Sequence, residues 1–190
     1  MTDADAPARM NRMPIGPGDF GLTMDELRVV ARYAVESAQE VLAIFEDAHP
    51  EDTRPRLAVE AAWTFANGAP RTKLQRVASL DAHRAAKSAA DDAAGHAARA
   101  AGDAASAAYL HPLAKATQVG HILRASASSA RAAELRAGDD PAVGDALIQQ
   151  ARQRATPVLI DVLGRYPFAP NGKSRVAQLM KALDSSLRAQ

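Results

Sequence analysis

The sequence of 190 residues contains no cysteine, which excludes disulfide bonds and metal sites built on thiolates. Aromatic residues make up only 4% of the chain, so large rings cannot fill most of a core. No uninterrupted apolar run approaches the length that spans a bilayer. The N-terminal residues lack the apolar segment of a secretory signal. We therefore expect a soluble, cytoplasmic protein with no membrane contact.

The chain also lacks an excess of charge of either sign, since its formal net charge is +1. Such a balance provides no overall field that would attract nucleic acid or an acidic membrane. Alanine, the strongest helix former, is abundant instead, and no alternating run of β-branched residues suggests a strand. We predict an all-α protein: a single compact bundle of six or seven helices, most of them antiparallel to their neighbours.

Prolines, glycines and capping residues divide the chain. Residues 1–21 predict a flexible N-terminal arm, and residues 22–190 predict one helical domain. Thr23 and Glu26 form a capping box that opens the first helix, which should end near residue 45. The other helices are predicted over 54–66, from 72 into the alanine-rich stretch 85–108, over 112–136, over 141–163 and from 174.

Two of these stretches are expected to be interrupted. Within 85–108 we predict a break near Asp91 and Asp92 or at Gly95, and another at Gly102, although one long interrupted helix is the alternative. Pro157 should kink or split the helix over 141–163. The second helix contributes Leu57 to an apolar stripe, and the third helix carries Leu74 and Val77.

The least ordinary stretch runs from His111 to Leu123, inside a helix predicted to begin at Pro112 and to be central in the bundle. Thr117 and His121 share one helix face, with Gln118 at its edge. Short neutral polar groups replace the Lys and Glu of an ordinary exposed face. A buried polar network that fixes helix register is the favoured interpretation, and a pocket that carries chemistry is the alternative.

The histidines do not predict a metal site. No two of them are three or four residues apart, and His111 and His121 are separated by ten residues along the predicted helix. Gly172-Lys173-Ser174 matches the end of a phosphate-binding loop, but Pro167 stands where the first glycine should be. We therefore predict no metal, no cofactor and no catalytic residues.

A basic cluster lies at the starts of the second and third helices. Its members are Arg54, Arg56, Arg71, Lys73 and Arg76. Two interpretations are open. In one, the cluster binds an anion, a small ligand or nucleic acid; in the other, its arginines form ion pairs with Asp52, Glu60 or Asp140. We favour the ion pairs. The acidic residues 139, 140 and 145 could be their partners or a separate docking patch.

Several short motifs occur together in a fixed order. They are Leu22 to Glu26, Ala48-His49-Pro50 with Asp52 to Arg56, Arg71-Thr72-Lys73, Tyr109 to Pro112, Ala116 to Val119 with His121-Ile122, Ala133-Glu134-Leu135 with Gly138 to Asp140, Arg154 to Pro157, and Tyr166-Pro167. Over about residues 22–188 this series resembles the immunity-five-like putative immunity proteins of bacterial polymorphic-toxin systems. The resemblance implies a non-catalytic protein that protects the cell by binding a cognate toxin domain.

Overall fold

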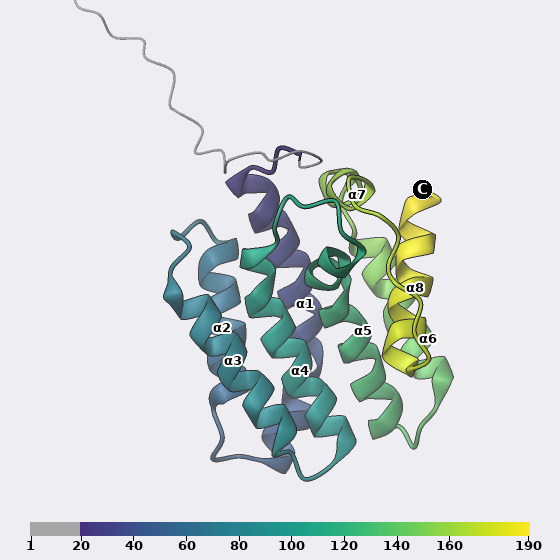
Figure 1. Ribbon diagram of the computed structural model, residues 1–190. Helices are drawn as coiled ribbons and strands as arrows, with labels where there is room; N and C mark the ends of the chain where they lie inside the picture. The colour runs from purple at the N-terminus through teal and green to yellow at the C-terminus, as the bar shows by residue number, and fades with distance from the viewer. Residues whose placement is uncertain (1–19) are drawn as a thin grey trace, which may run out of the picture.

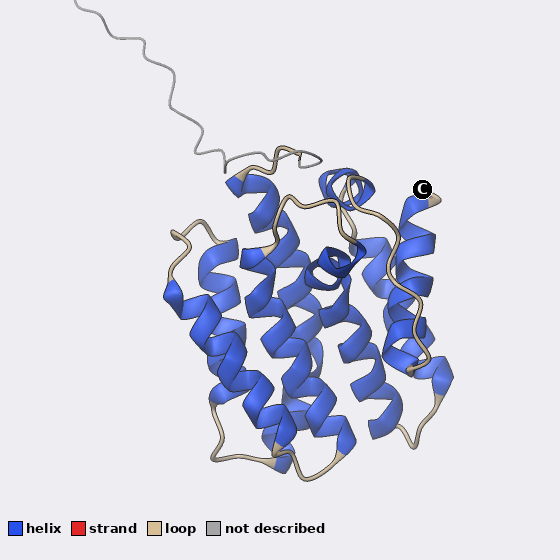
Figure 2. Ribbon diagram, in the orientation of Figure 1, coloured by secondary structure: helices blue, strands red, loops and turns tan. Residues whose placement is uncertain are grey.

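The computed structural model describes residues 20–190, which form helices and loops without a β-strand (Figure 2). The α-helices are α1 (Met24–Ala48), α2 (Arg54–Ala66), α3 (Lys73–Lys87), α4 (Asp92–Ser106), α5 (Val119–Arg136), α6 (Pro141–Arg154), α7 (Pro157–Gly164) and α8 (Arg175–Arg188), and two short 3-10 helices are η1 (Ala107–Tyr109) and η2 (Ala116–Gln118). The predicted all-α bundle is confirmed. Its described part has eight α-helices rather than six or seven, because Pro157 splits one predicted helix into α6 and α7.

Side-chain caps start these helices largely where the sequence places them. The Thr23 hydroxyl accepts from the Glu26 amide at 3.2 Å, and the Glu26 carboxylate accepts from the Thr23 amide at 2.7 Å, so the capping box is confirmed. Asp140 and Ser174 cap α6 and α8 as predicted. At α2 the capping carboxylate is Asp52, which accepts from the backbone amide of Arg54 at 3.2 Å.

Small side chains build the middle of the bundle. Helix α4 packs against α1, α2, α3 and α5, while α5 packs against α1, α4, α6 and α8 (Figure 1). Nearly every α4 residue from Ala93 to Ala105 is buried, and most of them are alanine. Because alanine occupies little volume, four neighbouring helices can approach α4 closely. The central position is therefore shared between α4 and α5.

The predicted break near Asp91 and Asp92 is confirmed, since α3 and α4 are separate helices joined there. The predicted break at Gly102 is wrong, because α4 continues through this residue. Gly102 faces the ring of His83 on α3, and an added Cβ would lie 2.9 Å from its Nε2 atom. The glycine therefore permits close helix packing, and that packing maintains the helix despite the low propensity of glycine.

The predicted helix start at Pro112 is also wrong. The chain after η1 is extended, and α5 begins only at Val119. Tertiary hydrogen bonds hold this extended segment: the Tyr166 hydroxyl donates to the His111 carbonyl at 2.9 Å, and the Phe20 amide donates to the Pro112 carbonyl at 3.3 Å. The Phe20 ring packs edge-on against Tyr166, so contacts distant in sequence override the helix signal of Pro112.

The predicted N-terminal arm lies outside the described residues except for its last two, of which Phe20 makes the contacts above. At the other side of the bundle, α6 and α8 pack on α5, and α7 lies across the end of the bundle near the start of α1 (Figure 1). Among the described residues, no helix combines the length and apolar character needed to cross a membrane.

Candidate functional site

The two groups of residues that the sequence singles out lie on either side of α3. Arg54 lines a groove of about 280 Å³ between α2 and α3. His111 and His121 line a second cavity of about 250 Å³, on the side of α3 that faces the segment before α5. Side chains of α3 form a wall of both hollows. The basic cluster and the His111–His121 stretch, which are far apart in the sequence, therefore both lie beside α3.

Large apolar side chains are exposed on this surface. Leu57 of α2 and Leu74, Val77 and Leu80 of α3 are each 52–53% exposed. The remaining large hydrophobic side chains with high exposure in the described chain are Val158 and Phe168. We call Leu57, Leu74, Val77 and Leu80 the α2–α3 apolar patch. Contiguous exposed apolar surface of this kind is typical of an interaction site.

Leu57, Leu74 and Val77 do not pack inward, although they lie in apolar parts of their helices, and the reason lies in the core. Helix α3 buries Gln75, Ala78, Ser79, Ala82, Ala85 and Ala86. Because α4 presents small residues to these positions, the close interface has no space for leucine. The buried face of α3 is therefore the one with small residues, and that pattern could have identified this face from the sequence.

The second cavity brings several polar groups together. It is lined by Arg76, Ser79, Leu80, Ser106, Tyr109, His111 and His121. The Tyr109 hydroxyl donates to the Thr72 carbonyl at 2.7 Å, which ties the rim to the start of α3. The pocket interpretation of the His111–His121 stretch thus has a geometric counterpart, although α5 begins only at Val119 and carries His121 without His111.

His121 has an unusual electrostatic environment within this cavity. The pKa of the His121 imidazole is lowered from 6.5 to about 4, mainly by burial and also by the nearby charges of Arg124 and His111. The Ser106 hydroxyl donates to the Asp103 carbonyl at 2.8 Å, and its oxygen lies 3.2 Å from Nδ1 of His121. Since that hydroxyl has only one hydrogen, we assign the ring proton to Nδ1, which leaves Nε2 as an acceptor.

Thr117, Gln118 and His121 do not form the predicted buried network. The Gln118 side-chain oxygen accepts from the His111 backbone amide at 3.0 Å, and His121 instead meets Ser106. Thr117 is exposed in η2. Because the segment before Val119 is not α-helical, the three side chains do not share the face that the predicted helix would give them.

The basic cluster is mostly engaged in contacts within the fold. Arg54 pairs with Asp52 at 2.6 Å, as the favoured interpretation predicts, and this hydrogen bond lowers the pKa of the Asp52 carboxyl. Arg56 pairs with Glu46 rather than with the expected Glu60 or Asp140. Arg71 and Lys73 differ: the Arg71 guanidinium donates to the Ala108 carbonyl and lies over the Tyr109 ring, while Lys73 is exposed in the first turn of α3.

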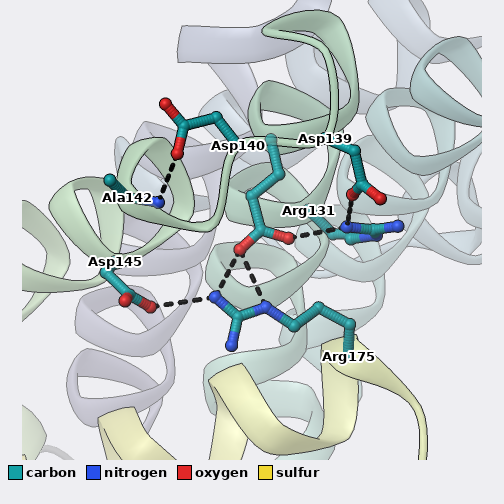
Figure 3. A network of polar contacts seen from close by, with 7 residues as sticks. Arg131, Asp139, Asp140, Ala142, Asp145 and Arg175 are labelled. Atoms are coloured by element: carbon teal, nitrogen blue, oxygen red, sulfur yellow. Dashed lines mark hydrogen bonds and ion pairs between the residues drawn. The ribbon is translucent and has the colours of Figure 1, made fainter.

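The acidic residues 139, 140 and 145 lie away from the basic cluster, at the junction of α5 and α6 (Figure 3). Asp140 accepts from the Ala142 amide at 2.9 Å and so caps α6. Asp139 pairs with Arg131, and Asp145 pairs with Arg175. Asp139 and Asp145 therefore pair with arginines of α5 and α8 rather than with the basic cluster, and Asp140 serves as a helix cap.

Sequence reasoning missed the carboxylate at the centre of this junction. Glu134 is completely buried, and one of its oxygens accepts from Arg175 Nε at 2.8 Å and Nη2 at 2.5 Å (Figure 3). Its other oxygen accepts from Arg131 at 2.9 Å. Charge-assisted bonds to a fully desolvated carboxylate join α5 to α8, so we assign this network to the stability of the fold.

A second buried acid, Asp103 of α4, was also missed. Burial raises the pKa of its carboxyl from 3.8 to about 7, while Arg124, Arg99 and a hydrogen bond from Ser128 oppose the shift. His83 Nε2 and Arg124 Nη1 lie 3.6 and 3.7 Å from one of its oxygens. Across residues 20–190, no three His, Asp or Glu side chains are placed to hold a metal ion together.

The fold defines an all-α bundle with an exposed apolar surface on two of its outer helices, α2 and α3. Residues 22–156, most of the chain, match the family described as Imm-5 like putative immunity protein. The chain belongs to this family, as the sequence motifs indicate. The match ends at Thr156, the N-cap of α7, rather than near residue 188. Comparisons with curated proteins and with solved structures found no significant match.

Proposed function

We propose that this protein is an immunity protein that acts in the cytoplasm by binding a toxin domain, without catalysis, through the α2–α3 apolar patch. Family membership over residues 22–156 is the observation that carries the proposal. The patch supplies a candidate contact surface, because its four half-exposed side chains would release water on association. Basic residues around the patch would speed the encounter with an acidic toxin surface.

The chain offers a direct test of this proposal. The toxin domain encoded beside the gene is expressed in a bacterial host with the wild-type chain, with Val77→Asp or Leu80→Asp, or with Val158→Asp as control. All three positions are exposed, so the variants should fold. We expect the wild type and the control to restore growth and the two patch variants to fail. Absence of rescue by the wild type would contradict the immunity function.

A second candidate function rests on the cavity beside His121. The guanidinium of Arg76 and the hydroxyl of Ser79 are donors suited to a small anionic ligand. Because Arg54 and Arg56 are already paired, the part of the basic cluster that lines this cavity, Arg76, is better suited to the anion-binding alternative than those two arginines are. Inorganic phosphate should then raise the melting temperature of the wild type but not of Arg76→Gln. Equal responses would exclude this function.

A further inference from the structure

We infer that the groove between α2 and α3 receives an acidic amphipathic helix of the toxin domain. This inference rests on the proposed immunity function and specifies its contact. The groove has the shape that a helix needs: Ala61 and Ala78 form a buried floor, and Leu57, Leu74 and Val77 stand beside it. An amphipathic helix places anchors at i, i+3 or i+4, and i+7 into such a groove.

The length of the groove fits two turns of a docked helix. Its lining on α3 extends from Leu74 to Asp81, which is about 10 Å at the rise of an α-helix. An incoming helix lying along the groove would place two or three large apolar residues against this lining. The buried alanines of the floor let these residues approach closely, since an alanine side chain projects little above the helix backbone.

The charges around the groove indicate which charges a bound helix should carry on its polar face. The two helices carry Arg54, Arg56, Lys73, Arg76, Arg84 and Lys87, but only Glu60 and Asp81 as acids. Asp81 is paired with Arg84 at 2.6 Å. Lys73 is exposed in the first turn of α3, and Lys87 is exposed in its last turn, at the opposite end of the groove. Arg54 also lies at that end, but its guanidinium is paired with Asp52 and donates to Ser88. Cations at both ends favour a helix with acidic residues at both of its ends.

The same charges disfavour the other occupants. A second copy of the chain would bring two basic surfaces together, which costs free energy through like-charge repulsion. A membrane with anionic lipids would suit the cations, but a flat bilayer surface would not enter the hollow between the helices.

Binding of the purified toxin domain to the full chain tests the inference. Affinity is measured by calorimetry for the wild type, for Leu57→Asp, for Lys73→Glu and for the control Val158→Asp. We expect Leu57→Asp to weaken binding by about a hundredfold and Lys73→Glu by about tenfold, with less effect of the latter at high salt. The control should bind like the wild type. Hydrogen exchange should map protection to an acidic amphipathic helix of the toxin.

The outcomes separate this inference from the function on which it rests. If the wild-type chain neither binds nor protects against the toxin, the immunity function itself fails. If it protects while Leu57→Asp and Lys73→Glu bind as tightly as the wild type, only the groove is wrong. Protection of a basic or non-helical toxin segment would also overturn the inference. Groove-dependent binding to phosphatidylglycerol vesicles, or groove-dependent dimerisation in sedimentation, would identify a different occupant.

Discussion

The buried carboxylate of Glu134 allows a quantitative test of how the second half of the bundle is held together. In Glu134→Gln, one carboxylate oxygen becomes an NH₂ group that must face a guanidinium, so a donor meets a donor (Figure 3). Removing one partner of a buried ion pair costs roughly 3–5 kcal/mol. Arg131 and Arg175 are 20% and 30% exposed and keep Asp139 and Asp145 as partners. We therefore expect the lower end, about 3 kcal/mol.

Urea unfolding followed by circular dichroism measures this change. The midpoint should fall with an unchanged slope, because the amount of surface exposed on unfolding stays the same. The melting temperature should fall by roughly 6–12 °C, since 1 kcal/mol corresponds to about 2–4 °C in a domain of this size. Asp25→Asn is the matched control, because the Asp25 carboxylate also pairs with an arginine at 2.7 Å but is 90% exposed.

The control variant should lose less than about 1 kcal/mol, as exposed pairs generally do. Two results would refute the reasoning about Glu134. One is a loss below about 1 kcal/mol for Glu134→Gln, which would mean that the negative charge is not needed at this position. The other is an equal loss in both variants, which would mean that burial does not determine the strength of these pairs.

Further predictions concern packing and pH. Gly144→Ala should lower the melting temperature, because the added Cβ would lie 2.1 Å from the buried Glu134 carboxylate, which is held by two arginines. Gly120→Ala should leave the melting temperature almost unchanged, since its Cβ would meet only the flexible end of the half-exposed Arg124 side chain. The pKa of the Asp103 carboxyl is raised, so the folded state binds this proton more tightly than the unfolded state does. The contribution of Asp103 to the free energy of unfolding therefore falls as pH rises from about 4 to 7. Urea unfolding of Asp103→Asn should not show this fall. His121 has a lowered pKa, so stability is lost as pH falls from 6.5 to about 4, and NMR should show a neutral ring at pH 6. A charged His121 ring at pH 6 would contradict the burial argument.

Local sequence signals predicted the features that depend on neighbouring residues. The Thr23 capping box, the Asp140 cap and the split at Pro157 each require only a few consecutive positions, and all three occur in the structure. The start of α5 could not be found in this way. Its extended approach is held by Phe20 and Tyr166, which are distant in the sequence, and no local pattern reports such contacts.

The candidate site was predictable only in pieces. The sequence singled out Arg54 and His121 separately, but their positions on two sides of α3 depend on how α2, α3 and α5 are packed. The burial of Asp103 and Glu134 was not predicted, although Glu134 belongs to a family motif, because a carboxylate in an alanine-rich helix resembles an ordinary exposed residue. Their burial follows from the small side chains around them, which bring the helices close together on every side.

The alanine-rich core also links the fold to the proposed function. Helix α3 packs against α2 and α4 and leaves its outer face uncovered, so Leu74, Val77 and Leu80 contribute little buried area to folding. Replacing Leu74 by Asn should therefore leave the melting temperature almost unchanged, whereas Leu27→Ala, at a fully buried position, should cost about 2–5 kcal/mol. If Leu74→Asn retains the wild-type melting temperature but no longer protects against the toxin, the exposed leucine serves binding and not folding. A large loss of stability in this variant would instead assign the patch to the fold.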